Sequence, residues 1–193
     1  MKTNIKTLLA VILVFLSTSC TKENTQSKSL IQTFNDNNKQ STAHYIGESY
    51  GGGVIFWLDS TGLHGLIAAT EDVSVGIKWN NGVNFRVGGT ESKIGSGRNN
   101  TRRIILKQGR GNYAAILCAR YKSGGYSDWF LPSKNELQEL CLQQNLVGNF
   151  YTGYYWSSTE YPQDGAWTKV FKSCNSYVLV KSDPLNVRAI RAF

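Results

Sequence analysis

Residues 125–137 read Gly-Tyr-Ser-Asp-Trp-Phe-Leu-Pro-Ser-Lys-Asn-Glu-Leu and carry the strongest local structural signal in the chain. Ser133 is followed three residues later by Glu136, the spacing of a capping box, in which each side chain accepts a hydrogen bond from the other residue's backbone N–H. Leu137, Leu140 and Cys141 then form an apolar stripe at helical spacing. We therefore predict a helix that begins after Ser133 and packs this stripe against a core.

Two further helices are predicted on the N-terminal side of this stretch. They span residues 100–108, capped by Asn100-Thr101, and residues 113–121, capped by Asn112, and glycines follow both. The linking residues 109–114, Gly-Arg-Gly-Asn-Tyr-Ala, match the dinucleotide pattern G-x-G-x-x-G/A. That pattern has meaning only between a strand and a helix of a βαβ unit, whereas a basic, helix-like stretch precedes it here. We interpret the glycines as a tight link between two helices.

Strand-like runs lie on both sides of the helical region. The predicted strands are residues 53–58, 65–69, 155–158, 166–171, 177–181 and 187–193. The first two are joined by the turn residues Asp59-Ser60-Thr61-Gly62 and so predict a hairpin, whereas residues 80–97 are rich in Gly and Asn and predict a loop. Strands, then helices, then strands indicate an α+β fold with an antiparallel sheet.

The N-terminus has the layout of a secretory signal. Two lysines precede a short uncharged apolar run, residues 8–16, which is shorter than the ~20 residues of a membrane span. Residues 17–20, Ser-Thr-Ser-Cys, resemble a bacterial lipobox, although the bulky Leu16 lies four residues before Cys20 rather than three. We expect a lipoprotein signal over residues 1–19 and a lipid anchor on Cys20. The alternative is an ordinary secretory signal with an incidental cysteine.

The region after Cys20 is polar up to residue 43. It is rich in Asn, Gln, Ser, Thr and Lys and cannot bury enough apolar surface to offset its ordering entropy. We therefore predict a flexible tether over residues 20–43 and a folded domain over residues 44–193. This layout predicts a lipid-anchored protein of the bacterial cell envelope, at the outer membrane, and leaves the periplasmic and extracellular faces both open.

Positive charge is concentrated in the middle of the chain. The whole chain has a formal net charge of +8, and residues 76–122 contain ten basic residues and one acid, Glu91. The densest part, the basic segment, has five basic residues and no acid: Arg98, Arg102, Arg103, Lys107 and Arg110. On an exported protein such a segment favours acidic polysaccharide over nucleic acid as the partner. The alternative is a solvated face that only aids solubility.

Signals for catalysis or metal binding are weak. The chain has no Gly-x-Ser-x-Gly elbow, no Cys-x-x-Cys or His-x-x-x-His spacing and no Asp-rich calcium loop. His64 lies in the predicted hairpin turn, and His44 lies at the edge of the predicted domain. The carboxylates available for glycoside cleavage are better explained as turn, capping or chance residues: Asp128, Glu136, Glu160 and Asp164. We expect no enzymatic activity, no metal and no cofactor.

Three cysteines follow Cys20, and an odd number leaves at least one unpaired. Cys118 and Cys141 lie in apolar, helix-like contexts, where a small buried residue is the usual role of cysteine. A disulfide that involves Cys174 is compatible with an exported protein, and its partner is left open.

Several motifs occur together: residues 125–137, residues 154–161 (Tyr-Tyr-Trp-Ser-Ser-Thr-Glu-Tyr), Ala166-Trp167 and residues 187–193 (Val-Arg-Ala-Ile-Arg-Ala-Phe). With residues 51–56 and 61–69 they make the chain similar to the Lcl C-terminal domain family over roughly residues 45–193. This resemblance implies a C-type-lectin-like fold and a secreted or surface-bound protein with an adhesive or glycan-binding role. The calcium-binding Glu-Pro-Asn and Trp-Asn-Asp motifs of sugar-binding C-type lectins cannot be placed in the chain.

The motif residues also have a structural interpretation. Trp129, Leu131, Trp156 and Trp167 are predicted to lie in the core. The segment from Leu131 to Leu137 also resembles a motif of the formylglycine-generating enzyme fold, but the paired catalytic cysteines of that enzyme cannot be placed here.

A binding module is therefore the predicted function. We expect an adhesin-like, lectin-like domain that recognises acidic polysaccharide through the basic segment, anchored to the membrane by lipid and without nucleic-acid partners. The alternative is a structural or protein–protein interaction lipoprotein of the outer membrane with no glycan ligand.

Overall fold

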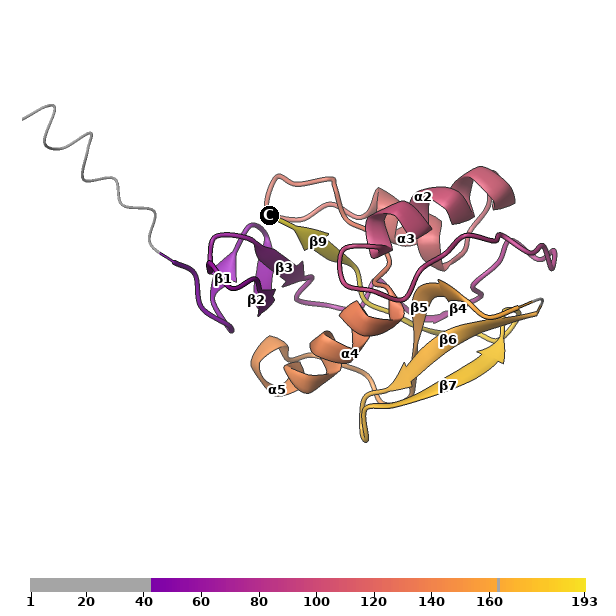
Figure 1. Cartoon of the computed structure of the whole chain (residues 1–193). Helices are drawn as coiled ribbons and strands as arrows, with labels where there is room; N and C mark the ends of the chain where they lie inside the picture. The colour runs from indigo at the N-terminus through magenta and orange to yellow at the C-terminus, as the bar shows by residue number, and fades with distance from the viewer. Residues whose placement is uncertain (1–42, 163) are drawn as a thin grey trace, which may run out of the picture. The chain divides into compact units, whose positions relative to one another are not determined.

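A computed structural model describes residues 43–162 and 164–193 (Figure 1). The predicted signal, the lipidated Cys20 and the tether up to residue 42 lie outside the described residues. In chain order the elements are β1 (Ser49–Tyr50), β2 (Gly53–Leu58), β3 (Gly65–Ala68), β4 (Ser74–Ile77), α2 (Gly97–Gln108), α3 (Ala114–Arg120), α4 (Lys134–Leu142), α5 (Gln144–Val147), β5 (Tyr154–Glu160), β6 (Gly165–Val170), β7 (Asn175–Val180), β8 (Leu185–Val187) and β9 (Ile190–Ala192). Within this part of the chain, no helix has the length and apolar character needed to cross a membrane.

The strands form two sheets, ordered β1-β2-β3-β9 and β4-β8-β5-β6-β7. Every pair is antiparallel except β5 and β8, which run parallel with Tyr155 opposite Asn186. The predicted α+β class is confirmed, with a mixed rather than a purely antiparallel second sheet. The predicted hairpin is also confirmed as β2 and β3, and the Asp59 carboxylate accepts hydrogen bonds from the backbone N–H groups of Thr61 and Gly62 in its turn.

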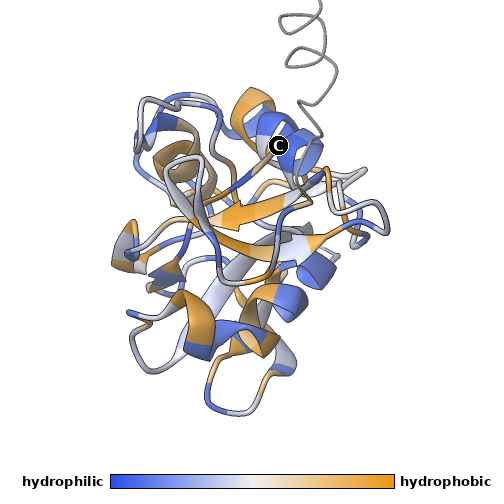
Figure 2. Ribbon diagram, turned by 90° about the vertical axis from the view of Figure 1, so that its left-hand side faces the viewer, coloured by the Kyte–Doolittle hydropathy of each residue, from blue (hydrophilic) through white to orange (hydrophobic). Residues whose placement is uncertain are grey.

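Helices cover strand β5 on both faces. Its residue Trp156 packs in a cluster with Ile104 of α2 and Ala114 of α3, whereas the neighbouring Tyr155 packs in a second cluster with Leu140 of α4. This alternation follows from the two-residue period of a strand, which points successive side chains to opposite faces. Figure 1 shows α2 and α3 on one side of the strands and α4 and α5 on the other, and Figure 2 shows hydrophobic strands in the middle and helices of mixed hydropathy around them.

The predicted capping box is confirmed at the start of α4. The Glu136 N–H donates to Ser133 Oγ at 3.3 Å, and the Ser133 N–H donates to Glu136 Oε2 at 2.7 Å. The predicted stripe of Leu137, Leu140 and Cys141 is buried.

The predicted starts of the two preceding helices are wrong. Helix α2 begins at Gly97, and the residues expected to cap it, Asn100 and Thr101, are buried inside it. No side chain of its own caps this start; instead the N–H groups of Gly95 and Gly97 donate to Glu136 Oε1, at 2.8 and 3.4 Å. Helix α3 begins after Tyr113 rather than after Asn112, and ends at Arg120.

The last predicted strand, residues 187–193, is split between the two sheets as β8 and β9. The division lies at Arg188, whose buried guanidinium donates to Asp72 Oδ1 at 2.6 Å and to the Ala69 carbonyl at 2.8 Å. A buried charge is tolerated only when it is paired and hydrogen-bonded. The chain therefore leaves one sheet at Arg188 to satisfy this side chain and enters the other at Ile190.

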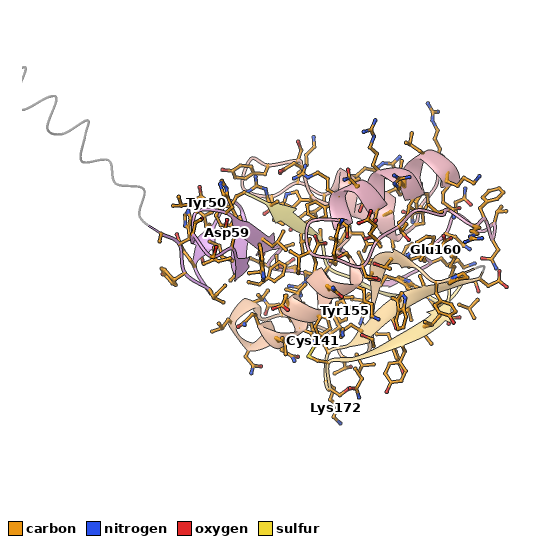
Figure 3. The ribbon with its side chains drawn as sticks, in the orientation of Figure 1. Tyr50, Asp59, Cys141, Tyr155, Glu160 and Lys172 are labelled. Atoms are coloured by element: carbon orange, nitrogen blue, oxygen red, sulfur yellow. A yellow bond between two sulfur atoms is a disulfide. The ribbon has the colours of Figure 1, made fainter. Side chains whose placement is uncertain are left out.

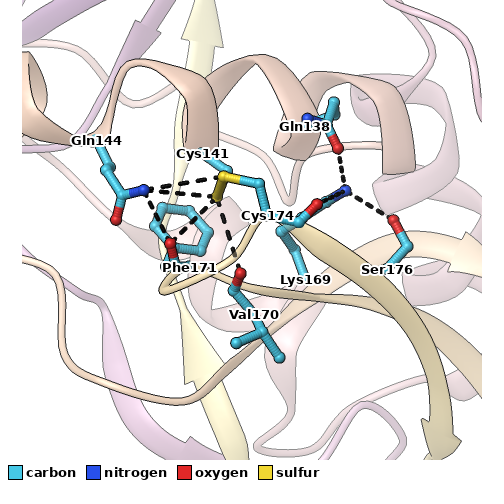
Figure 4. The surroundings of a disulfide bond; sticks show 8 residues. All are labelled: Gln138, Cys141, Gln144, Lys169, Val170, Phe171, Cys174 and Ser176. Atoms are coloured by element: carbon cyan, nitrogen blue, oxygen red, sulfur yellow. Dashed lines mark hydrogen bonds between the residues drawn. A yellow bond between two sulfur atoms is a disulfide. The ribbon is translucent and has the colours of Figure 1, made fainter.

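A disulfide joins Cys141 of α4 to Cys174 in the turn after β6 (Figure 4). Cys118 is free and buried, and burial raises the pKa of its thiol far above the usual value. The interpretation of Cys118 as a small buried residue is confirmed, whereas for Cys141 it is incomplete, because this residue is the partner of Cys174. The amide Nε2 of Gln144 lies beside the disulfide and donates to the Phe171 carbonyl (Figure 4).

Of the four residues predicted for the core, Trp129, Leu131 and Trp156 are buried. Trp167 is only half-buried, since its ring faces the Lys134 ammonium at 3.4 Å from the ring centroid rather than the interior. A cation over an aromatic ring is a favourable arrangement that keeps the charge near water.

Candidate functional site

Helix α2 presents the basic segment to solvent. Its buried side contains Thr101, Ile104 and Gln108. Because an α-helix turns by about 100° per residue, the four basic residues of α2 lie on the remaining side, and Arg110 follows in the link to α3. All five are exposed, and we refer to them as the basic surface: Arg98, Arg102, Arg103, Lys107 and Arg110. In Figure 3, nitrogen-tipped side chains project outward from the region of α2 and α3.

The link between α2 and α3 has the predicted role of a tight connection. Gly109 ends α2 with a φ of 73°, a left-handed conformation that glycine adopts without the penalty of a Cβ atom. The Tyr113 hydroxyl donates to the Gly109 carbonyl at 2.7 Å and closes the link. The glycine pattern at residues 109–114 therefore positions Arg110 next to the end of the basic helix.

Most of the basic surface lacks a negative partner. Arg98 Nη2 lies 3.1 Å from Asp128 Oδ2. Among residues 43–162 and 164–193, no carboxylate forms an ion pair with the other four residues. Glu91 forms its ion pair with Lys93 instead, and the pKa of this exposed carboxyl group is lowered by its hydrogen bond with Lys93 and by the charge of Lys93, and to a lesser extent by the charge of Arg103. The helix therefore exposes positive charge that the described part of the chain does not neutralise.

Leu106, which is 74 % exposed, divides the basic surface into two parts. On one side lies a hollow of about 300 Å³ next to Arg98 and Arg102, lined by both of these and by Thr101, Ile105, Leu106, Ala119, Ser127, Asp128, Trp129 and Phe130. On the other side lies a hollow of about 270 Å³ next to Arg103 and Lys107, lined also by Val87, Gly88 and Leu106. We call the first of these the Arg102 hollow.

Asp128 fixes the wall of the Arg102 hollow. Its Oδ1 accepts from Arg191 Nε at 2.8 Å and its Oδ2 from Arg98 Nη2. Partial burial opposes ionisation of this carboxyl group, but the hydrogen bonds from Arg191 and Arg98 outweigh it, and the pKa of Asp128 is lowered. Arg191 is held in turn by stacking 3.8 Å from the centroid of the Tyr126 ring, and Arg98 lies 5.1 Å from that of Phe130.

The role of Asp128 and of the residues around it is not predicted from the sequence. Asp128 lies 30 positions from Arg98 and 63 from Arg191. The sequence signal for the contacts of Asp128 with Arg98 and Arg191 is limited to their opposite charges. That signal becomes specific only when the pairing of the segments is known.

A larger hollow of about 540 Å³ lies elsewhere, lined by Glu71, Asp72, Ser74, Val75, Asn149 and Tyr151. Its buried carboxylate is already engaged, since Asp72 Oδ1 accepts from Arg188 and Oδ2 accepts from the Tyr155 hydroxyl at 2.6 Å. Burial and this hydrogen bond raise the pKa of Tyr155. The hollow therefore offers no free buried polar group from these residues, and its size alone does not make it the better candidate.

The carboxylates considered for glycoside cleavage have separate structural partners. Glu160, labelled in Figure 3, pairs with buried Lys181 at 2.6 Å and accepts from the N–H groups of Val87 and Gly88. Glu136 is fully buried between two helix starts, where burial raises its pKa against the effect of its backbone hydrogen bonds. Asp164 accepts from Asn84.

Neither histidine lines the Arg102 hollow. His64 is exposed in the β2–β3 turn, and His44 Nδ1 lies 2.9 Å from Glu48. Over the described ranges, no three His, Cys, Asp or Glu side chains gather as ligands of a metal ion would.

Comparison with known proteins gives no match to a family model and none to a curated protein. The similarity to the Lcl C-terminal domain family, and the lectin-like fold that it implies, therefore remain predictions from the quoted motifs.

Proposed function

We propose that the chain is a lipid-anchored binding module of the bacterial envelope, and that its basic surface recognises acidic polysaccharide. The observation that carries the proposal is the unneutralised positive charge of α2: four exposed basic residues on one helix and a fifth at its end, of which only Arg98 has a carboxylate partner among the described residues. Arginine suits this ligand because its planar guanidinium binds carboxylate and sulfate groups in a bidentate manner.

The cysteine chemistry supports an exported location. Disulfides form and persist in oxidising compartments and are rare in the cytosol. The bond between Cys141 and Cys174 clamps helix α4 to the turn after β6 and therefore agrees with the predicted signal and with an envelope address. Lipid attachment at Cys20 is part of the proposal and is testable by labelling with a fatty-acid analogue, which a Cys20→Ser variant should abolish.

Binding of the whole chain, purified in mild detergent, to immobilised sulfated and carboxylated polysaccharides tests the proposal. Binding should be saturable at low salt and should weaken steeply as ionic strength approaches about 0.15 M, where charges separated by more than about 8 Å are screened. Arg102→Glu should reduce affinity strongly, and the double reversal of Arg102 and Arg103 should abolish binding. The matched control is Lys172→Glu, an exposed lysine far from α2 in Figure 3, which changes the net charge equally.

A loss of binding that is equal in Arg102→Glu and Lys172→Glu would mean that only the overall charge matters. Absence of binding at low salt would refute the proposal. If the polysaccharide does not bind, the exposed side chain of Leu106 favours protein–protein interaction as the function, since an apolar residue inside a polar rim is typical of a protein interface. Crosslinking from position 106 in intact cells would then identify a protein partner.

A further inference from the structure

The Arg102 hollow combines three kinds of chemistry in one place. Its volume of about 300 Å³ lies at the lower end of the range for small-ligand pockets, which is about 300–1,000 Å³. Cationic, anionic and apolar groups all line it, whereas the hollow on the other side of Leu106 is lined by cationic and apolar residues and a glycine. A ligand that fits the Arg102 hollow must therefore satisfy more than positive charge.

The cationic wall contains one fixed and one free guanidinium. Arg98 is held by the Asp128 carboxylate at 3.1 Å and lies against the Phe130 ring. Arg102, one helical turn further on, forms no ion pair with any carboxylate of the described residues. Its five N–H donors are therefore available for a ligand anion, and their planar fork matches a carboxylate.

The anionic wall provides an acceptor that is held by two arginines. Asp128 receives hydrogen bonds from Arg98 on one oxygen and from Arg191 on both, at 2.8 and 3.4 Å for the latter. A carboxylate has about four lone-pair positions, so at least one is left for a hydroxyl group. The exposed Ser127 beside it adds a hydroxyl that can donate or accept.

Much of the remaining lining of the hollow is apolar. Leu106 is largely exposed, Ile105 is half-buried, and Ala119, Trp129 and Phe130 also line the hollow. Such a surface suits the C–H face of a sugar ring, because burying apolar area is favourable whichever molecule supplies it.

We propose that the Arg102 hollow is a subsite for a single carboxylated pyranose, such as a uronate unit of an acidic polysaccharide. The ligand carboxylate pairs with Arg102, its hydroxyl groups bond to Asp128 and Ser127, and its apolar face lies on Leu106 and Ile105. A neutral sugar leaves Arg102 without a partner, and an inorganic anion uses neither the hydroxyl acceptors nor the apolar lining. The inference deepens the proposed function and rests on it for the nature of the polymer.

Calorimetric titration of the whole chain with trigalacturonate, with its neutral galactose analogue and with sodium sulfate tests the subsite. Trigalacturonate should bind at least about tenfold more tightly than the neutral analogue or sulfate. A tenfold difference in affinity is the effect expected when a ligand lacks one charge-assisted hydrogen bond. Ser127→Trp fills the hollow from an exposed loop without changing charge and should weaken trigalacturonate binding at least about tenfold. The matched control is Ser182→Trp, at another exposed serine, which should bind like the wild type.

The outcomes separate the subsite from the proposed function. If the polymer binds and Ser127→Trp leaves trigalacturonate binding unchanged, the subsite is refuted while the proposed function stands. Equal affinity for trigalacturonate and its neutral analogue also refutes it. If trigalacturonate binds and Ser127→Trp blocks it, although the polymer fails to bind, the subsite is supported and the polymer proposal fails. If neither binds, both fail.

Discussion

Replacing Gly97 with alanine should destabilise the protein, although the same change in a helix is normally favourable. Alanine is preferred to glycine in helix interiors by about 1 kcal/mol. At Gly97, however, the added Cβ would overlap the buried carboxylate of Glu136 and lie 2.9 Å from the Leu131 carbonyl oxygen and 3.0 Å from Phe130 Cδ2. The Glu136 carboxylate would have to move.

The cost follows from what that carboxylate holds. It accepts from the N–H of Ser133 at 2.7 Å and from the N–H of Gly95 at 2.8 Å, so that it joins the starts of α4 and α2. A hydrogen bond to a charged group contributes about 1.5–3 kcal/mol, and overpacking a core adds about 1–3 kcal/mol. After subtraction of the helix preference of about 1 kcal/mol, we expect Gly97→Ala to lower the free energy of unfolding by about 1.5–5 kcal/mol.

Urea unfolding followed by tryptophan fluorescence at neutral pH measures this loss. Asn99→Ala is the matched control, two residues further on in the same helix, and should be neutral or slightly stabilising because Asn99 is exposed. In a double-mutant cycle, Gly97→Ala should cost less when Glu136 is already alanine, since part of the overlap has gone. A Gly97→Ala variant as stable as the wild type would refute the contact between Glu136 and the start of α2.

Two further changes test the disulfide and the wall of the Arg102 hollow. Replacing both Cys141 and Cys174 by serine should lower the free energy of unfolding by about 3–4 kcal/mol, which is the loop-closure value for their separation of 33 residues. The wild type unfolded in the presence of reductant should be as stable as this variant. If the variant were as stable as the oxidised wild type, the disulfide would not be stabilising. Asp128→Asn should be less stable than the wild type at neutral pH, because the pKa of Asp128 is lower in the folded protein than in the unfolded chain. This difference stabilises the fold above the pKa of the unfolded chain, near 3.8, and the stabilisation is lost as pH falls through the pKa of the folded protein. The difference between the two proteins should therefore shrink in urea unfolding below about pH 3.8, and a difference that stays constant over the pH range would speak against this ion pair.

Local signals in the sequence were sufficient for some elements. The capping box at Ser133 and Glu136 acts within four residues, so the start of α4 could be placed from the sequence. The β2–β3 hairpin is likewise set by its own turn residues. The outward position of Arg103 and Lys107 follows from helical spacing once α2 is recognised.

Elements that depend on distant contacts could not be placed in this way. Helix α2 begins early because the carboxylate at its start comes from Glu136, which lies 39 residues from Gly97 in sequence. The split of the last strand at Arg188 depends on Asp72, 116 residues away. In both cases a buried polar side chain selects the local conformation, and no local pattern reveals its partner. The same holds for the Arg102 hollow, whose walls come from two segments that are separate in sequence.

The distribution of paired and unpaired cations separates stability from the proposed function. Arg188 is fully buried and bound to the buried Asp72 carboxylate, so removing either partner leaves a charge without compensation in the interior, which typically costs about 3–5 kcal/mol. Arg191 is buried too, but its partner Asp128 is 37 % exposed, so solvent weakens that pair. Arg102 and Arg103 are exposed and have no carboxylate partner in the described part of the chain. Exposed charges contribute little to folding, and their reversal usually changes stability by less than about 0.5 kcal/mol. Because the fold does not need these two arginines, a loss of binding on their reversal can be assigned to the surface itself.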